Sequence, residues 1–170
     1  MYYEMTVKFY TGRLNALRSL LETAQKQSQE RNIAEDVVLG LRLAPDMFAF
    51  ARQVQITCDN AKLSTARLAG VEAPKNEDTE KTFTELIARI DSTLAFLATL
   101  KESDFAEAAT RKIELKYFPD MHFTAEGYLL SYALWNYMFH ETAVYMILRN
   151  NGYNVGKKDF AGALPLIPNA

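Results

Sequence analysis

The sequence from residue 124 to residue 152 reads TAEGYLLSYALWNYMFHETAVYMILRNNG and is the most apolar helical segment of the chain. Its apolar and small side chains recur every three or four residues, as one buried face of a helix requires. The spacing predicts a helix from about Thr124 to about Asn151, with Gly152 as its stop. The inward-facing positions of this helix are Leu129, Ala133, Asn136, His140, Ala143 and Ile147.

Three further segments show the same periodicity, at about residues 6–31, 45–69 and 78–101. Pro45 suits a first helical turn, because its missing N–H would be unsatisfied there anyway. Gly70 is placed to cap the end of the second helix. Four amphipathic helices of this length predict an all-α fold, a four-helix bundle.

Two regions lack helical periodicity. Residues 111–123 alternate between apolar and polar side chains around a turn at residues 118–120, which predicts a short β-hairpin in the crossover between the third and fourth helices. Residues 156–170 contain two prolines and no period, so we expect an extended C-terminal tail there. At this length we expect residues 1–170 to form a single domain.

The composition restricts the class of protein. Apolar residues make up 49% of the chain, charged residues 24%, and the formal net charge is -2, without the basic stripe typical of nucleic-acid-binding proteins. The single cysteine, Cys58, cannot form an intramolecular disulfide, which favours a reducing compartment. No segment resembles a signal peptide or reaches the roughly 20 apolar residues of a membrane span. We therefore expect a cytoplasmic protein with neither a nucleic-acid nor a membrane partner.

Asn136 and His140 are polar residues on an otherwise apolar face, one helical turn apart. Burying them without partners would cost about 1–3 kcal/mol each. One interpretation is a buried hydrogen-bond network with nearby tyrosines. The other is a pocket between helices, where bundles build their ligand and metal sites, and this places Tyr137 in the pocket wall.

The second helix offers polar partners for that pair. Gln53 and Gln55 flank its apolar stripe, and Asp59 lies one turn beyond Gln55. These side chains can lie at the solvent boundary, or Gln55 can point into the same cavity as His140. A phase error of one residue would exchange Gln53 for Gln55, so both stay candidates, with Gln55 preferred.

The chain resembles the DinB-like (YfiT-type) superfamily, and within it the DUF1993 branch. The resemblance extends over nearly the whole chain. The segments that carry it are Leu41–Phe48, Ala51–Gln55, Leu68–Glu72, Asn136–His140, Ile147–Gly152 and Gly156–Phe160.

That resemblance implies a four-helix bundle, often a homodimer. Many superfamily members bind a divalent metal through three histidines, and some are thiol-dependent transferases or isomerases. In this chain only His140 matches a ligand position, because Asn136 and Gln55, or less well Gln53, stand at the other two. Amides are poor ligands for nickel or zinc, so a tightly held metal is not expected and His140 is the one candidate ligand.

The sequence therefore favours a degenerate metal site that has become a polar pocket for a small molecule, between the second and fourth helices. The predicted pocket residues are Gln53, Gln55, Asn136, Tyr137 and His140. If the protein is an enzyme, His140 is the candidate general base, because an unperturbed imidazole titrates near neutrality. One alternative is a divalent-metal-dependent thiol transferase or isomerase. The other is a structural homodimer without catalytic activity.

Overall fold

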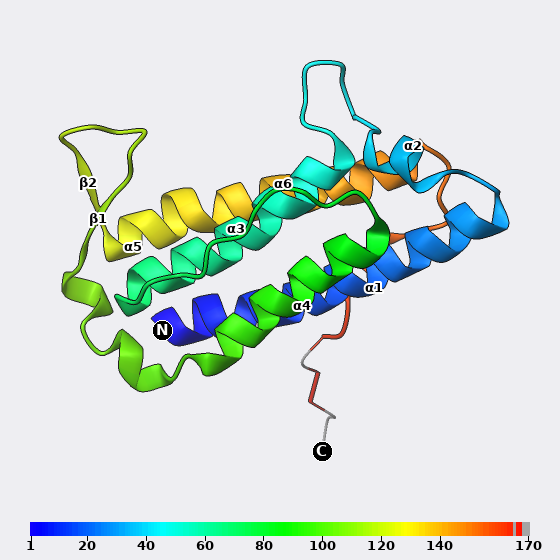
Figure 1. Cartoon of the computed structure of the whole chain (residues 1–170). Helices are drawn as coiled ribbons and strands as arrows, with labels where there is room; N and C mark the ends of the chain where they lie inside the picture. The colour runs from blue at the N-terminus through cyan, green and yellow to red at the C-terminus, as the bar shows by residue number, and fades with distance from the viewer. Residues whose placement is uncertain (165, 168–170) are drawn as a thin grey trace.

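The computed structural model describes residues 1–164 and 166–167. Four long helical segments lie side by side and form a bundle (Figure 1). Helix α3 is central, because it packs against both α4 and α6, while α1 closes the bundle against α4. The helices of the bundle are α1 (Phe9–Glu30), α3 (Phe50–Ala69), α4 (Phe83–Thr99) and α6 (Leu134–Asn150). The predicted helical bundle is confirmed.

A turn of π-helix directly precedes two of the long helices, α1 and α6. Segment η1 (Glu4–Lys8) leads directly into α1, and α5 (Ala125–Tyr128) continues through the π-helical η4 (Leu129–Ala133) into α6. The predicted helix at residues 124–151 is therefore one continuous helical run. Its start is fixed by Thr124, whose side chain accepts a hydrogen bond from the backbone N–H of Gly127.

The crossover between α4 and α5 contains the predicted hairpin. Strands β1 (Lys112–Glu114) and β2 (His122–Thr124) pair antiparallel, with Ile113 opposite Phe123. Two short 3₁₀ turns, η2 (Glu102–Phe105) and η3 (Ala108–Thr110), precede it. The hairpin projects from one end of the bundle (Figure 1). Helix α2 (Glu35–Leu39) lies in the connection between α1 and α3.

Two predicted helix starts were wrong. Helix α3 begins at Phe50 and not at Pro45, because Pro45 follows the first residue of a turn in which the N–H of Met47 donates to the carbonyl of Ala44. Proline at the second position of such a turn is as favourable as at a helix start. Helix α4 begins at Phe83 because Thr82 and Glu85 form a reciprocal capping box.

The expectation of a wholly extended C-terminal tail was also wrong. Residues Lys157–Ala161 form the short helix α7, which packs against α1. Arg13 on α1 holds it by donating a hydrogen bond to the carbonyl of Ala161 and by lying 4.5 Å over the ring of Phe160. The tail positions 165 and 168–170 lie outside the described residues.

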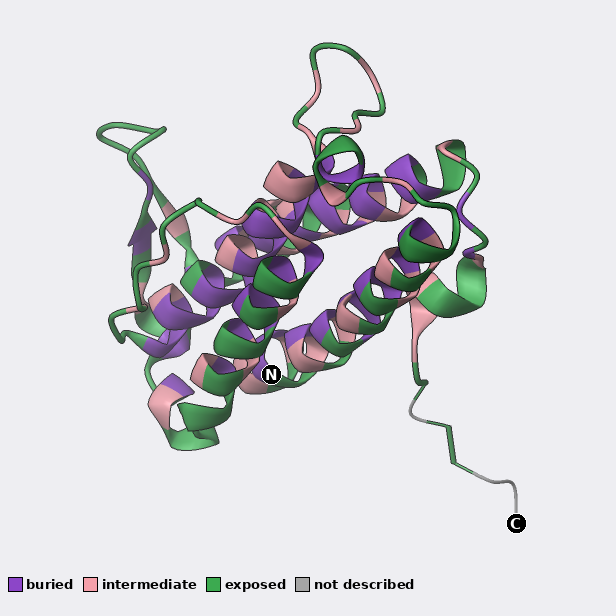
Figure 2. Cartoon of the chain, turned by 45° about the vertical axis from the view of Figure 1, so that its right-hand side comes forward, coloured by how far each residue is buried: buried purple, intermediate pink, exposed green. Residues whose placement is uncertain are grey.

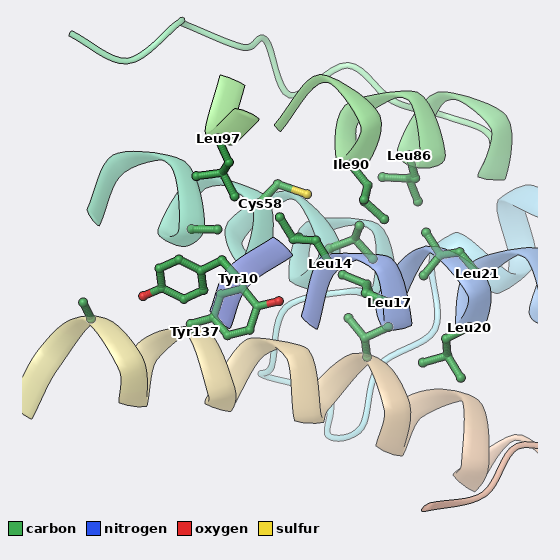
Figure 3. Close-up of a cluster of buried hydrophobic side chains, with 14 of the residues drawn as sticks. Tyr10, Leu14, Leu17, Leu20, Leu21, Cys58, Leu86, Ile90, Leu97 and Tyr137 are labelled. Atoms are coloured by element: carbon green, nitrogen blue, oxygen red, sulfur yellow. The ribbon is translucent and has the colours of Figure 1, made fainter. Parts of the chain in front are cut away.

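The core lies between the four helices, where the inner faces are buried and the outer faces exposed (Figure 2). Figure 3 shows leucines of α1 meeting Leu86, Ile90 and Leu97 of α4. Cys58 on α3 is fully buried in this core, and burial raises its pKa to about 12. Its thiol is therefore protonated and inert at neutral pH, as expected for a small core residue. Across the described ranges, no helix is long and apolar enough to cross a membrane, and the cytoplasmic location stays a prediction.

Candidate functional site

A polar cleft of about 360 Å³ lies where α3 meets the helical run of α5, η4 and α6, next to the hairpin. This volume lies within the range of small-molecule sites. Its lining combines polar and apolar side chains from three parts of the chain. The α3 residues are Arg52, Ile56, Asp59, Asn60, Leu63 and Arg67, and the other lining residues are Phe48, Leu115, Tyr117, Tyr132, Asn136 and His140.

His140 enters this cleft in a defined orientation. Its Nδ1 atom lies 2.6 Å from Oε1 of Gln53. The amide of Gln53 is itself oriented, because its Nε2 atom donates to the backbone carbonyl of Phe48. Oε1 must therefore accept, and the Nδ1 of His140 must carry the proton.

The other ring nitrogen of His140 is consequently a hydrogen-bond acceptor. In a neutral imidazole with a protonated Nδ1, the Nε2 atom keeps its lone pair. Burial, assisted by the positive charge of Arg52, lowers the pKa of His140 from 6.5 to about 4, so the ring is neutral at physiological pH. Among the described residues, none hydrogen-bonds Nε2, and the residue lines the cleft.

Asn136 lies one turn before His140 on α6 and also lines the cleft. Its Nδ2 donates to Oδ1 of Asn60 at 2.8 Å, while Nδ2 of Asn60 donates to the carbonyl of Ile56. The donors of Asn136 are thereby directed toward α3. The side-chain oxygen of Asn136 is a second acceptor on a residue that lines the same cleft as His140.

Gln55 does not belong to this site, so the preference for it over Gln53 was wrong. Its Nε2 donates to Glu80 at 2.8 Å, and its Oε1 accepts from Arg52. Side chains two residues apart on an α-helix point in directions that differ by about 200° around the helix axis. Gln53 therefore points toward α6, while Gln55 points toward the segment that precedes α4.

Tyr137 is not a wall of the cleft, which corrects the second site prediction. It is fully buried on the α1 side of α6, where its ring lies 4.8 Å from that of Tyr10. Figure 3 shows these two rings facing each other in the core. The aromatic residue that does line the cleft from η4 is Tyr132.

Asn60 and Arg67 are among the lining residues that were missed from the sequence. Both lie on the face of α3 that carries Gln53, because residues seven apart on a helix share a face. That spacing was a readable signal, but it required knowing that Gln53 faces α6. The three cross-helix contacts, Gln53 with His140, Asn60 with Asn136 and Arg67 with Tyr128, follow one another along antiparallel helices.

The DUF1993 model, which describes a domain of unknown function, matches residues 2–161. The chain belongs to the DUF1993 family. A crystal structure of a DinB family member from Shewanella denitrificans is 40% identical to the DUF1993 chain, with a TM-score of 0.94. The match covers 98% of this chain and 95% of that one, and it confirms the predicted resemblance. No curated protein matches the sequence.

The donor set of the DUF1993 cleft does not fit the three-histidine metal site of the wider superfamily. Within residues 1–164 and 166–167, no three His, Cys, Asp or Glu side chains come together to hold a metal ion. The only imidazole is flanked by the neutral amides of Gln53 and Asn136, and the charge of Arg52 disfavours a second cation nearby. Nickel and zinc prefer imidazole and thiolate ligands.

Proposed function

We propose that this protein binds a small polar molecule in the cleft between α3 and α6. The observation that carries the proposal is the hydrogen-bond chain from Phe48 through Gln53 to His140. It presents the Nε2 lone pair of His140 to the cleft without a protein donor. Because this acceptor is open to the cleft and has no protein partner among the described residues, a ligand donor can pair with it in place of water.

The lowered pKa of His140 supports binding over proton transfer. A general base works best when its pKa lies near the working pH. With a pKa of about 4, His140 is a poor proton acceptor at neutral pH but a good hydrogen-bond acceptor. The site is thus suited to recognise a ligand that carries a hydroxyl or amide N–H group.

The test is a thermal-shift measurement on the full chain with hydroxycarboxylates, amino acids, polyols, sugars and nucleosides. The variant Leu63→Trp fills the cleft from its rim, where Leu63 is 37% exposed, without touching the His140 network. At least one compound class is expected to stabilise the native chain and to lose its effect in Leu63→Trp. The matched control is Val37→Trp, at an exposed position on α2.

Two results would overturn this proposal. One is that no class raises the melting temperature of the native chain. The other is that the shifts are equal in the native chain and in Leu63→Trp, which would place the binding elsewhere.

A second candidate function is self-association, which the exposed apolar face of α6 favours. This α6 apolar face consists of Trp135, Phe139 and Met146 with Leu43 and Met47 beside them. Trp135 is 72% exposed and Phe139 59%. The face contains no charged residue, so two copies can meet about a two-fold axis without opposing like charges. Sedimentation velocity is expected to show a dimer that Trp135→Lys dissociates and that the hairpin control Tyr117→Lys does not. A monomeric native chain would exclude this function.

A further inference from the structure

The two ends of the cleft carry different charges, because one end belongs to a balanced ion-pair network. Arg89 on α4 is the centre of this network, and its side chain is 2% exposed. It pairs with Asp59, Asp78 and Glu80 at 2.8–3.0 Å. Arg52 adds a further contact to Asp78, and Lys62 one to Asp59. Three cations thus face three carboxylates, which leaves no net charge at this end.

Arg67 lies at the other end of the cleft and is not part of that network. Its Nη1 atom donates to the hydroxyl of Tyr128 at 2.9 Å, and its guanidinium lies 5.9 Å from the ring of the same tyrosine. Within the part of the chain that the structure describes, no Asp or Glu pairs with it. A half-buried guanidinium without a counter-ion is a binding group for carboxylate or phosphate oxygens.

The length of the ligand is set by the distance between the His140 end of the cleft and Arg67. Arg67 lies about four turns beyond Gln53 along α3, which is roughly 20 Å along the helix axis. The long side chain of Arg67 shortens that span. Between the ends, the lining is mixed: the side chains of Ile56, Leu63 and Tyr132 offer an apolar surface, and Asp59, Asn60 and Asn136 add polar groups.

We infer that the ligand is an elongated anion, with an oxyanion group at Arg67, a middle that packs on Ile56, Leu63 and Tyr132, and a neutral hydrogen-bond donor at Nε2 of His140. This inference rests on the proposed function and names its ligand class. Although the network at this end carries no net charge, Arg52 is the charged group that acts on the imidazole of His140. A hydroxyl therefore suits the His140 end better than an ammonium group. Carboxylate and phosphate share the chemistry that Arg67 recognises.

The test is isothermal titration calorimetry of the full chain with ω-hydroxycarboxylates of increasing length, from hydroxybutyrate to hydroxydodecanoate. Three matched probes of each length lack one feature: the alkanoate lacks the hydroxyl, the α,ω-diol lacks the charge, and the ω-aminocarboxylate replaces the hydroxyl by an ammonium group. The ω-hydroxyalkyl phosphate separates the two oxyanions. The hydroxyl-bearing anions are expected to bind best, with an optimum at one intermediate length.

Three variants test which group of the ligand binds at each end of the cleft. Arg67→Gln is expected to weaken the hydroxycarboxylate roughly tenfold or more, because a charge-assisted hydrogen bond is lost, and to leave the diol unchanged. Arg67→Lys keeps the charge and is expected to recover part of the affinity. His140→Ala is expected to weaken the hydroxycarboxylate about three- to tenfold and to leave the alkanoate unchanged.

The inference is overturned if the diol binds as tightly as the hydroxycarboxylate, if Arg67→Gln has no effect, or if no chain length binds. Its failure is distinguishable from failure of the proposed function. Diol binding that Leu63→Trp abolishes would refute the anion subsite at Arg67 and still support a polar ligand in the cleft.

Discussion

The imidazole of His140 on α6 and the amide of Gln53 on α3 form a hydrogen bond of 2.6 Å between Nδ1 and Oε1. In many enzymes a carboxylate occupies the position of this amide and stabilises the protonated ring. A neutral amide orients the ring in the same way but gives no such stabilisation. The pair therefore fixes the tautomer of His140 while keeping the ring uncharged.

Replacing Gln53 by glutamate tests this electrostatic argument. A carboxylate at this position favours the imidazolium form, so the pKa of His140 is expected to rise by about 1–3 units from about 4. The titration is measured by NMR from the imidazole resonances. The same measurement on the native chain supplies the reference. An unchanged titration of His140 would contradict the contact.

His140 and Glu141 are adjacent in sequence and are expected to affect stability with opposite dependence on pH. Burial, partly offset by Arg13, raises the pKa of Glu141 from 4.5 to about 7. The stability that this carboxyl contributes is full below pH 4.5 and is lost as the pH rises through about 7. For His140 the pKa is lowered, so its contribution is full above pH 6.5 and is lost as the pH falls through about 4.

Urea denaturation at several pH values separates the two groups. From pH 4.5 to pH 7, the free energy of unfolding of the native chain relative to Glu141→Gln is expected to fall by roughly 3 kcal/mol. Relative to His140→Ala, the native chain is expected to change in the opposite direction. A difference that stays constant with pH in either comparison would show that the residue does not titrate as described.

The ion-pair network around Arg89 is expected to be a major determinant of stability. Arg89→Met leaves the carboxylates of Asp59, Asp78 and Glu80 without their shared cation. Breaking a buried pair by removing one partner costs about 3–5 kcal/mol. Chemical denaturation measures the loss. The control is Arg18→Met, whose ion pairs with Glu22 and Asp91 lie at the surface, and which is expected to change stability little.

A loss in Arg89→Met no larger than that in Arg18→Met would show that Lys62 and Arg52 compensate for the missing guanidinium. In that case the charge balance at the Arg89 end of the cleft would not depend on Arg89.

The register between α3 and α6 can be tested by building a metal site. Gln53→His together with Asn136→His places two imidazoles beside His140, and three imidazoles are a normal zinc ligand set. This double variant is expected to bind zinc in calorimetry, whereas the native chain is not. The matched control, Gln55→His with Asn136→His, places the second imidazole toward Glu80 and is expected to bind zinc weakly. Equal zinc affinity of the two double variants would contradict the assigned register.

The secondary structure of this protein is largely determined by local sequence. The apolar periodicity predicted the four long helices, and the alternation at residues 111–123 predicted the hairpin that Ile113 and Phe123 form. Gly70 adopts the left-handed conformation expected of a helix cap. These features depend on neighbouring residues and on which face of an element is apolar, and both can be read along the chain.

Local patterns gave a wrong prediction where the same residue type is compatible with two kinds of local structure. Pro45 is equally suitable for a helix start and a turn, and the hydrogen bond from Met47 to Ala44 decides for the turn. The π-helical η4 was not predicted either. A π-helical turn holds one more residue than an α-helical turn, and it therefore alters the phase of α6 relative to α5.

The composition of the site was decided by tertiary structure alone. Gln53 and Gln55 are both buried, because α3 packs against α6 on one side and α4 on the other. Periodicity identifies a residue as inward but does not say toward which neighbour it points. Which residues meet His140, and whether Arg67 lacks a counter-ion, depends on how the helices are rotated and aligned against each other. The sequence thus determined that a polar site lies on the fourth helix at Asn136 and His140, and only packing determined its partners.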